Sequence, residues 1–439
     1  MKKLLALLII AILATNISIA SENVFIVNPT SIRNQLLSKN MTLLQALNNV
    51  QNSKLNVSMA RAKLLPSLNL SVLLPALANP TFLLSSVTFL FPFLVPSNWA
   101  VLKQQKELFE ADKASYKAIQ LNILSNSLSL YYTYLNDIKV QKVYSDQSEV
   151  LGRLYSTLKK QSVILGNVTS EDLEMSHAQW QESLIRTSKL QELLVEEKAA
   201  LRTLLGLPLG SELITEEVGL LPSEFETKSV FEIADHSLLV SPESLQLNYL
   251  MNAARLGKYS KVFGFLSTSV IAGNSTNGSS PFEDLKVSGG FSFGMDNLIN
   301  IKIGNNNIQS IVLREEQLKQ ENERTAEILI GKIYEVKEQQ ELTTLSLQSR
   351  LKVYQGQKRQ YLLGLISLQT LLLTESQLTD SKVNYFKTNL DLNIQRLTLQ
   401  RLVIDGDFLE VKGCVESKVE KKKRIFNFKK SQSLDEVCQ

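Results

Sequence analysis

The side chains best suited to catalysis or metal binding are few in this chain, which has two histidines and two cysteines among 439 residues. His177 lies in a run of helical periodicity, and His236 lies about sixty residues later in a linking segment. Zinc sites and catalytic triads need several such groups at a defined spacing. No glycine-rich phosphate loop is present. We therefore expect no catalytic residue, no metal ligand and no cofactor, and we expect that the protein is not an enzyme.

The charge and the cysteines give little further chemistry. The formal net charge of +4 is small for this length and makes no case for nucleic-acid binding. Cys414 and Cys438 both lie near the end of the chain, where two cysteines are not a disulfide framework. The sequence leaves open whether they pair.

The first twenty residues predict a secretory signal peptide. Lys2 and Lys3 provide a positive start, an apolar run extends from Leu4 to Ala14, and small residues stand at Ser18 and Ala20. The run is shorter than the ~20 residues that a membrane-spanning helix needs, so we expect cleavage after Ala20. An uncleaved anchor is the alternative.

Two stretches predict transmembrane β-hairpins, at 64–97 and 258–304. No charged side chain occurs between Lys63 and Lys103, and the five prolines of that interval exclude a spanning helix. In the second stretch Val287, Phe291 and Phe293 alternate with small or polar residues. A strand with lipid on one side and water on the other has this pattern. A soluble sheet packed on a protein core has it too, so the pattern alone leaves both open.

Two helical hairpins follow these stretches, at 98–205 and 305–404. In the first hairpin the apolar spacing breaks at Gly166, and Thr169 or Ser170 can cap the next helix. In the second hairpin Gly364 breaks the spacing and Ser367 can cap the next helix. A shift of 198 residues aligns the two glycines, which indicates an internal duplication.

The fold class is therefore mainly α with a small β part, built twice over. The predicted order is a signal peptide (1–20), an N-terminal periplasmic segment with a short helix (21–63), the first β-hairpin (64–97), the first helical hairpin (98–205), an equatorial linker with a short helix (206–257), the second β-hairpin (258–304), the second helical hairpin (305–404) and a basic tail (405–439). Four strands cannot close a barrel, and open edges in lipid leave amides unpaired, so we expect several copies to assemble.

Several stretches resemble the TolC-like outer-membrane efflux factors. No single motif is highly specific, but their order over about residues 41 to 404 carries the resemblance. They are Met41 to Leu47, Ala60 to Leu70, Leu204 to Pro208, Leu165 to Thr169 and Leu363 to Ser367.

The resemblance implies a homotrimer in the outer membrane of a Gram-negative bacterium, with a large periplasmic part. Each chain would give four strands to a twelve-stranded β-barrel and four helices to a periplasmic α-barrel. The tube would be a passive conduit for efflux or type I secretion, in contact with outer-membrane lipid. Its partners would be a periplasmic adaptor and an inner-membrane pump of the RND or ABC type.

The resemblance also assigns roles to the turns between the long helices. The adaptor-docking tips would be Gly166, Asn167, Val168, Thr169, Gly364, Leu365, Ile366 and Ser367. Some family members close the inner end with carboxylates, at positions that correspond here to Thr370 and Leu373. We therefore hypothesise a constriction formed by Thr370, Leu372 and Leu373. Packing of these leucines between helices is the alternative, and the one that we favour.

The basic tail and the rival function complete the expectations. The tail carries Phe426 and Phe428 among lysines and can contact anionic lipid or the adaptor, although such tails are more often disordered. The rival is an exported coiled-coil scaffold or interaction protein whose strands form a small soluble sheet. A channel would fractionate with the outer membrane, whereas a scaffold would dissolve without detergent. The passenger and the pump type cannot be inferred, because specificity resides mainly in the pump.

Overall fold

The computed structural model describes residues 24–65, 93, 95–165, 168–263 and 295–411. The predicted signal peptide, most of both predicted β-hairpins, Gly166, Asn167, both cysteines and the tail from residue 412 lie outside the described residues. The chain divides into two compact units. Unit 1 comprises residues up to 40, 126–220 and 335–394, and unit 2 comprises 41–125, 221–334 and 395 onward.

Four long helices dominate the described residues. Helix α7 (Pro96–Leu165, 70 residues) is followed by α8 (Ser170–Leu204), and α11 (Met295–Leu362, 68 residues) by α12 (Leu368–Val403). These are the two helical hairpins that the apolar spacing predicts, and the mainly α class is confirmed. The number of copies and the closure of a barrel stay predictions.

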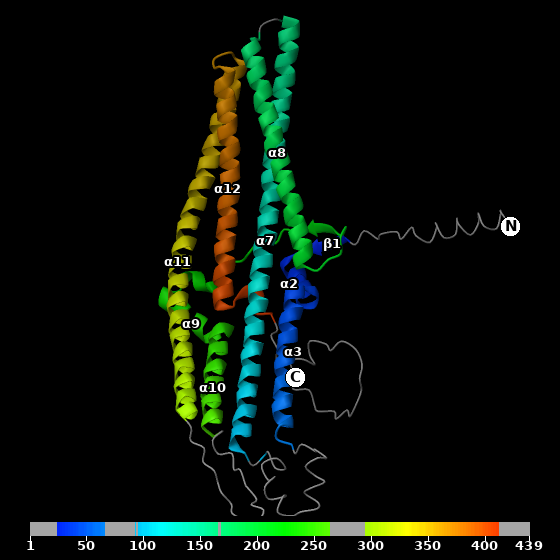
Figure 1. Cartoon of the computed structure of the whole chain (residues 1–439). Coiled ribbons are helices and arrows are strands. Elements are labelled where there is room, and N and C mark those ends of the chain that lie inside the picture. Colours follow the sequence, from blue (N-terminus) through cyan, green and yellow to red (C-terminus); the bar gives the residue numbers. More distant parts are fainter. Residues whose placement is uncertain (1–23, 66–92, 94, 166–167, 264–294, 412–439) are drawn as a thin grey trace, which may run out of the picture. The chain divides into compact units, whose positions relative to one another are not determined.

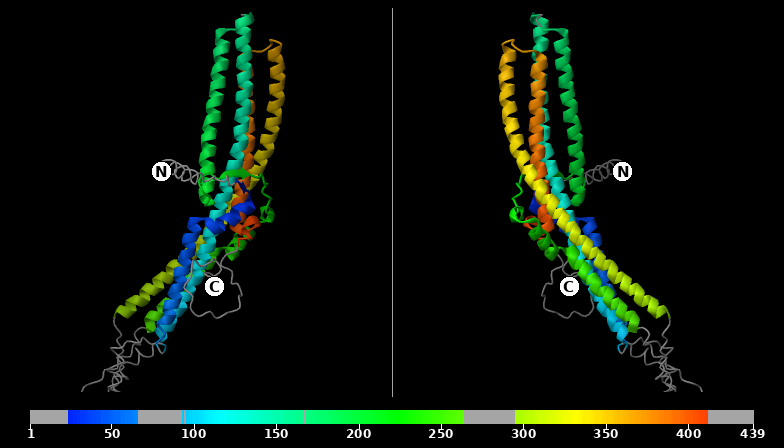
Figure 2. Two further views of the ribbon diagram at one scale, coloured as in Figure 1. Left: turned by 90° about the vertical axis from the view of Figure 1, so that its right-hand side faces the viewer. Right: turned by 90° about the vertical axis from the view of Figure 1, so that its left-hand side faces the viewer.

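Unit 1 contains the second half of α7 with α8, and the second half of α11 with α12. Figure 1 shows each pair side by side, and the views of Figure 2 agree. A side-chain hydrogen bond joins Gln141 of α7 to Gln191 of α8, and another joins Gln340 of α11 to Asn389 of α12. Each pair is therefore a hairpin in space as well as in sequence.

A two-stranded parallel sheet also belongs to unit 1. Strand β1 (Val24–Val27) pairs with β2 (Glu212–Thr215), with Val24 opposite Glu212 and Val27 opposite Thr215. Asn28 ends β1 and caps α2 (Pro29–Lys39) by accepting a hydrogen bond of 2.7 Å from the amide of Ser31. Sequence analysis missed both strands, because four residues are too few to give a periodic signal.

In unit 2, α3 (Met41–Ala62) and α10 (Pro242–Phe263) accompany the first halves of α7 and α11. Val57 and Ala60 of α3 pack against Leu102 of α7 in a small apolar cluster. The short helix α9 (Val230–Val240) precedes α10 and begins at a capping box formed by Ser229 and Glu232.

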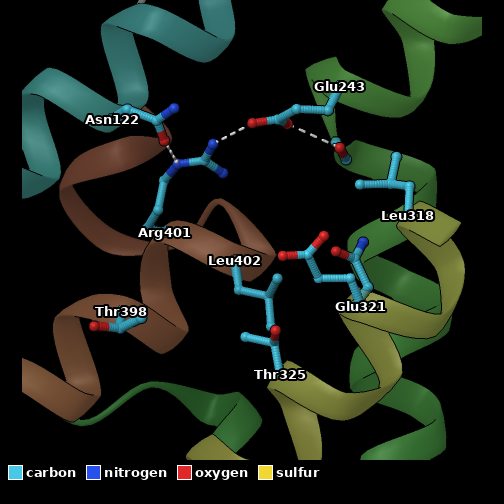
Figure 3. Close-up of a pocket in the computed structure, with 10 residues that line it drawn as sticks. Asn122, Glu243, Leu318, Glu321, Thr325, Thr398, Arg401 and Leu402 are labelled. Carbon is cyan, nitrogen blue, oxygen red and sulfur yellow. Dashed lines mark hydrogen bonds and ion pairs between the residues drawn. The ribbon is translucent and has the colours of Figure 1, made fainter. Parts of the chain in front are cut away.

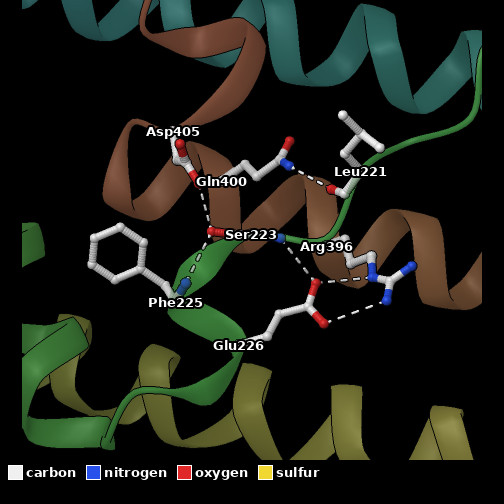
Figure 4. Close-up of polar contacts among 7 residues, drawn as sticks. All are labelled: Leu221, Ser223, Phe225, Glu226, Arg396, Gln400 and Asp405. Atoms are coloured by element: carbon white, nitrogen blue, oxygen red, sulfur yellow. Dashed lines mark hydrogen bonds and ion pairs between the residues drawn. The ribbon is translucent and has the colours of Figure 1, made fainter.

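The segment 221–227 is held against the end of α12 by polar contacts (Figure 4). It contains the 3₁₀ turn η2 (Glu224–Thr227), and a second such turn, η4 (Gly406–Phe408), follows α12. Arg396 forms an ion pair of 2.9 Å with the buried carboxylate of Glu226, and Ser223 donates to Asp405 at 2.6 Å. The Nε2 of Gln400 donates to the carbonyl of Leu221 at 3.0 Å. These bonds fix a segment that has no regular partner strand.

The range 258–304, predicted as a β-hairpin, is helical at both ends. Helix α10 continues to Phe263, and α11 already begins at Met295. Residues Ile299, Ile301 and Ile303 alternate as in a strand, but short apolar runs do not decide between helix and strand by themselves. Packing decides here, because Gly304 lies against Lys258 of α10. Among the described residues, no helix is both long and apolar enough to cross a bilayer.

Two glycines in the turn that follows α8 allow a matched test of how that turn packs against the end of α2. Gly206 and Gly210 both have positive φ, at +61° and +87°. A Cβ on Gly206 would lie 2.8 Å from the carbonyl oxygen of Lys39, whereas a Cβ on Gly210 would meet no atom within 4 Å.

Gly206→Ala should therefore destabilise the protein more than Gly210→Ala. Each substitution costs about 1 kcal/mol for the left-handed backbone, and Gly206→Ala adds roughly 1–3 kcal/mol for overpacking. Thermal unfolding followed by circular dichroism measures both variants. Equal melting temperatures would show that the backbone around Gly206 shifts to accommodate the added Cβ without further loss of stability.

Candidate functional site: the helix tips

The two turns between the long helices lie at the same end of unit 1 (Figure 1). Thr169 caps α8, because its Oγ1 accepts a hydrogen bond of 3.0 Å from the amide of Asp172. Ser367 caps α12 in the same way, at 3.3 Å from the amide of Thr370. Both capping predictions are confirmed.

Gly364 ends α11 in the left-handed conformation, with φ +72°. The amide of Gly364 donates to Tyr361 and that of Leu365 to Gln360, both at 2.9 Å, so carbonyls of the last turn are paired. A Cβ on this glycine would meet no atom within 4 Å. The backbone conformation, and not a close neighbour, is the reason for glycine here.

The tips expose large apolar side chains to solvent. Leu365 is 69% exposed, and the residues that are also exposed beside the two turns are Val163, Ile164, Leu362 and Leu363. Exposed apolar groups gathered at one place mark a contact surface for another protein. Of the eight predicted docking residues, Gly166 and Asn167 lie outside the described residues, and the other six lie in or next to these turns.

Directly below the turns, an apolar cluster joins all four helices. Its buried members are Leu151 and Leu158 of α7 and Leu368 and Leu372 of α12, and side chains of α8 and α11 pack around them, among them Trp180 and Tyr361. The indole of Trp180 lies on Gly152, where an added Cβ would be 2.9 Å from Nε1. We call these residues the tip cluster.

The three predicted constriction residues lie in different surroundings. Leu372 is only 6% exposed and belongs to the tip cluster, so its position is that of a leucine packed between helices. Leu373 is 59% exposed. Thr370 is half-buried, with its hydroxyl 3.0 Å from that of Ser367. Of the two leucines, only Leu373 is open to solvent in a single chain.

One turn from the tip cluster, a buried carboxyl group lies between α7 and α12. Glu375 accepts hydrogen bonds from Gln147 at 2.8 Å and from Thr379 at 3.1 Å. Burial raises the pKa of the Glu375 carboxyl, and both hydrogen bonds act against the rise. Sequence analysis missed this pair. The sequence of α7 does contain an indication of this contact. Gln147 occupies a buried position in a row of helix positions whose other members include Val140, Val143 and Leu151.

Both histidines pack against aromatic rings. The His177 ring stacks on Tyr155, with centroids 4.6 Å apart, and Trp180 stacks on the same tyrosine at 5.6 Å. The His236 ring lies 4.7 Å from that of Phe225. In the part of the chain that the structure describes, no three His, Cys, Asp or Glu side chains are grouped to hold a metal ion.

A cavity of about 390 Å³ lies in unit 2 (Figure 3). Arg401 at its edge binds the carboxylate of Glu243 and donates at 2.9 Å to the side-chain oxygen of Asn122. Asn322, also in the lining, donates to Ser237 at 3.1 Å. Arg401 thus joins α12 to α7 and α10, and Asn322 joins α11 to α9, so these polar groups of the cavity are already bound to other side chains.

No family model matches the sequence, and neither does any curated protein. Solved structures do match. A membrane protein from Pseudomonas aeruginosa aligns with a TM-score of 0.69 at 13% identity, over 85% of this chain and 93% of that one. CusC, whose structures describe transmembrane channel formation, aligns at 0.66 and 14%, over 85% and 91%. The open outer-membrane channel MtrE of Neisseria gonorrhoeae aligns at 0.64 and 12%, over 85% and 88%.

This chain has the fold of the outer-membrane efflux channels. The likeness covers 85% of this chain and extends over 88–93% of each of the three matched chains. It confirms the mainly helical fold of a single chain that the resemblance implied, whereas the trimer and the twelve-stranded barrel stay predictions. At this identity it assigns no function to single side chains, so the docking and constriction roles stay predictions.

The channel fold brings Gln147 and Glu375 together, and Gln147→Leu tests that contact. Because burial raises the pKa of Glu375 in the folded state, stability is lost as pH rises from the ordinary glutamate value through the folded value. The Gln147 amide binds the ionised carboxylate more strongly than the protonated carboxyl group, so its removal should cost more at pH 8 than at pH 4, by about 1–3 kcal/mol once the group is ionised. Melting temperatures across pH measure this.

Gln161 is an exposed glutamine on the same helix, and Gln161→Leu is the control for that substitution. It should leave the melting temperature unchanged at both pH values. A loss for Gln147→Leu that is the same at pH 4 and pH 8 would contradict a role in binding the carboxylate.

The two adjacent leucines of the constriction hypothesis should differ in stability. Leu372→Ser removes a buried side chain from the tip cluster and should cost about 2–5 kcal/mol. Leu373→Ser changes an exposed side chain and should stay within about 0.5 kcal/mol of the wild type. Thermal unfolding of the two variants checks this, and a large loss for Leu373→Ser would place that residue in a core that only the assembly forms.

Proposed function

We propose that the chain is one subunit of a trimeric outer-membrane channel, through which a separate pump moves its cargo out of a Gram-negative cell. The observation that supports this most is the fold, which matches that of known outer-membrane channels over about nine tenths of their length. The two predicted β-hairpins would supply strands to a barrel in the outer membrane.

Assembly with further copies is supported by apolar side chains that a single chain leaves exposed. On the long helices of unit 1 these include Ile185 and Val195 of α8 and Leu342 and Leu345 of α11. Apolar residues along a helix are covered in stable proteins, and identical copies are the partners that a symmetric tube provides. Three copies would bring twelve strands and twelve long helices together.

The helix tips are the proposed contact with a periplasmic adaptor, which links the channel to an inner-membrane pump. Support comes from the exposed apolar residues around the two turns, such as Val163 and Leu365. Efflux of small molecules and type I protein secretion both use such an arrangement. The channel would be a passive conduit, and its chemistry would be limited to the lining of the lumen.

Leu373 is the residue that we propose for the narrow inner end. It lies next to the tip cluster and is exposed in the single chain, as a side chain facing a lumen would be. Leu372, which is buried in the tip cluster, would keep α12 packed against α7.

Cell fractionation and electrical recording test the function together. The full-length protein should fractionate with the outer membrane, form a trimer in detergent and conduct ions in planar bilayers. Leu373→Ser should increase the single-channel conductance, because a smaller, polar side chain widens and wets a leucine ring.

Leu209→Ser is the control, since Leu209 is almost fully exposed and far along the chain from the tips. It should leave the conductance unchanged. A protein that dissolves without detergent and conducts no ions would instead support an exported coiled-coil scaffold. Unchanged conductance in Leu373→Ser, with an otherwise normal channel, would remove only the constriction hypothesis.

A further inference from the structure

Four helix ends lie together at one end of unit 2 (Figure 1). Helix α3 ends there at Ala62, α7 begins at Pro96, α10 ends at Phe263 and α11 begins at Met295. The views of Figure 2 show the same grouping.

Side-chain contacts join these ends in a row. Ala60 of α3 packs against Leu102 of α7. Gly257 of α10 lies against Gln104 of α7, so closely that an added Cβ would be 2.6 Å from Nε2. Gly304 of α11 would place its Cβ 3.2 Å from that of Lys258 on α10. The residues around the four ends therefore share one surface.

This surface carries many basic side chains and almost no acidic ones. Basic residues within about three turns of these ends include Arg61, Lys63, Lys103, Lys106, Lys258, Lys261 and Lys302. None of the seven forms an ion pair with another residue of the described ranges. The sequence has no acidic residue in 41–65, 93–106 or 244–263, and Asp296 alone in 295–314.

Exposed aromatic rings lie among these charges. Trp99 is 47% exposed and Tyr259 is 54% exposed, and Phe93 and Leu65 are exposed beside them. The indole N–H of Trp99 donates to the carbonyl of Phe93 at 2.7 Å, so the polar group of this half-exposed side chain is paired. We call the seven basic residues, with Phe93, Trp99 and Tyr259, the basic–aromatic collar.

We propose that the basic–aromatic collar binds the anionic phospholipid headgroups of the periplasmic leaflet of the outer membrane. The inference rests on the proposed function, because the chain continues from the collar into the two segments predicted to cross the membrane. Tryptophan and tyrosine favour the headgroup region, where one end of the side chain is wet and the other apolar. Lysines that form no ion pair with an acidic side chain favour negatively charged headgroups over zwitterionic ones.

This occupant fits better than a protein or a nucleic acid. The basic residues belong to four separate helix ends that lie side by side at one end of the unit. A flat lipid surface can contact all four ends at once. Each lysine near an anionic surface raises affinity about fivefold at low ionic strength, and salt weakens the effect.

The two tryptophans of the chain allow a direct test of location. Trp180→Phe leaves Trp99 as the only tryptophan, and Trp99→Phe leaves Trp180 of the tip cluster as the matched control. Both variants are reconstituted as full-length protein into phosphatidylcholine vesicles, with and without brominated acyl chains. We expect strong quenching for Trp180→Phe and none for Trp99→Phe. Equal fluorescence of Trp180→Phe in both kinds of vesicle would overturn the proposal.

The preference for anionic lipid is tested by a charge-matched pair of triple variants. Lys103, Lys261 and Lys302 are changed to Gln in the collar variant, and the exposed Lys189, Lys352 and Lys358 of unit 1 in the control. Each protein is mixed with equal amounts of phosphatidylglycerol and phosphatidylcholine in detergent, and native mass spectrometry counts the lipids that stay bound. The collar variant should lose about a hundredfold in preference for phosphatidylglycerol.

The outcomes separate this inference from the proposed function. If the control and the wild type favour phosphatidylglycerol and the collar variant does not, the collar is confirmed as a lipid-binding surface. If the protein conducts ions but all three bind both lipids equally, the inference alone is wrong. If the protein is soluble without detergent and does not sediment with phosphatidylglycerol vesicles, both proposals are wrong.

Discussion

The structure depends on one constraint, which is that a long helix with a narrow apolar stripe is stable only beside other helices. Helix α7 has 70 residues, and its buried side chains recur at intervals of three and four, among them Leu121, Leu124 and Leu128. At 1.5 Å per residue it is roughly 100 Å long, and an isolated helix in water derives little stability from its own hydrogen bonds. Pairing with α8 and α12 covers part of the stripe. The apolar side chains that remain exposed are the physical reason to expect further copies.

Sequence analysis predicted the long helices best, because in them this constraint produces a periodic pattern of apolar residues. The apolar spacing located α7, α8, α11 and α12, and the caps at Thr169 and Ser367 followed from side-chain chemistry alone. It was weakest where tertiary contacts decide. The pairing of β1 with β2 joins residues nearly two hundred positions apart, and neither strand is long enough to show a pattern. The helical start of α11 at Met295 depends on contact with α10 through Gly304.

The candidate site was predicted in the same uneven way. Glycine and capping residues marked both turns, because a helix that reverses direction needs them in the sequence itself. Whether Leu372 or Leu373 points into a core could not be inferred from a run of three leucines, in which one step along the helix turns the side chain by ~100°. The contact between Gln147 and Glu375 brings together residues from both halves of the duplication, so no local sequence pattern predicts that these two residues meet.

That contact also limits how the two hairpins can move. Gln147 and Glu375 form a buried polar contact near the apolar tip cluster, and a buried polar pair favours a single alignment of its helices. Sliding α12 along α7 by one turn, ~5.4 Å, would separate the Gln147 amide from the Glu375 carboxyl group and bury the amide without this partner. Axial sliding is therefore the costly displacement, whereas parting the helices sideways lets water reach both groups. The helices at the tip can therefore separate sideways more easily than they can slide along one another.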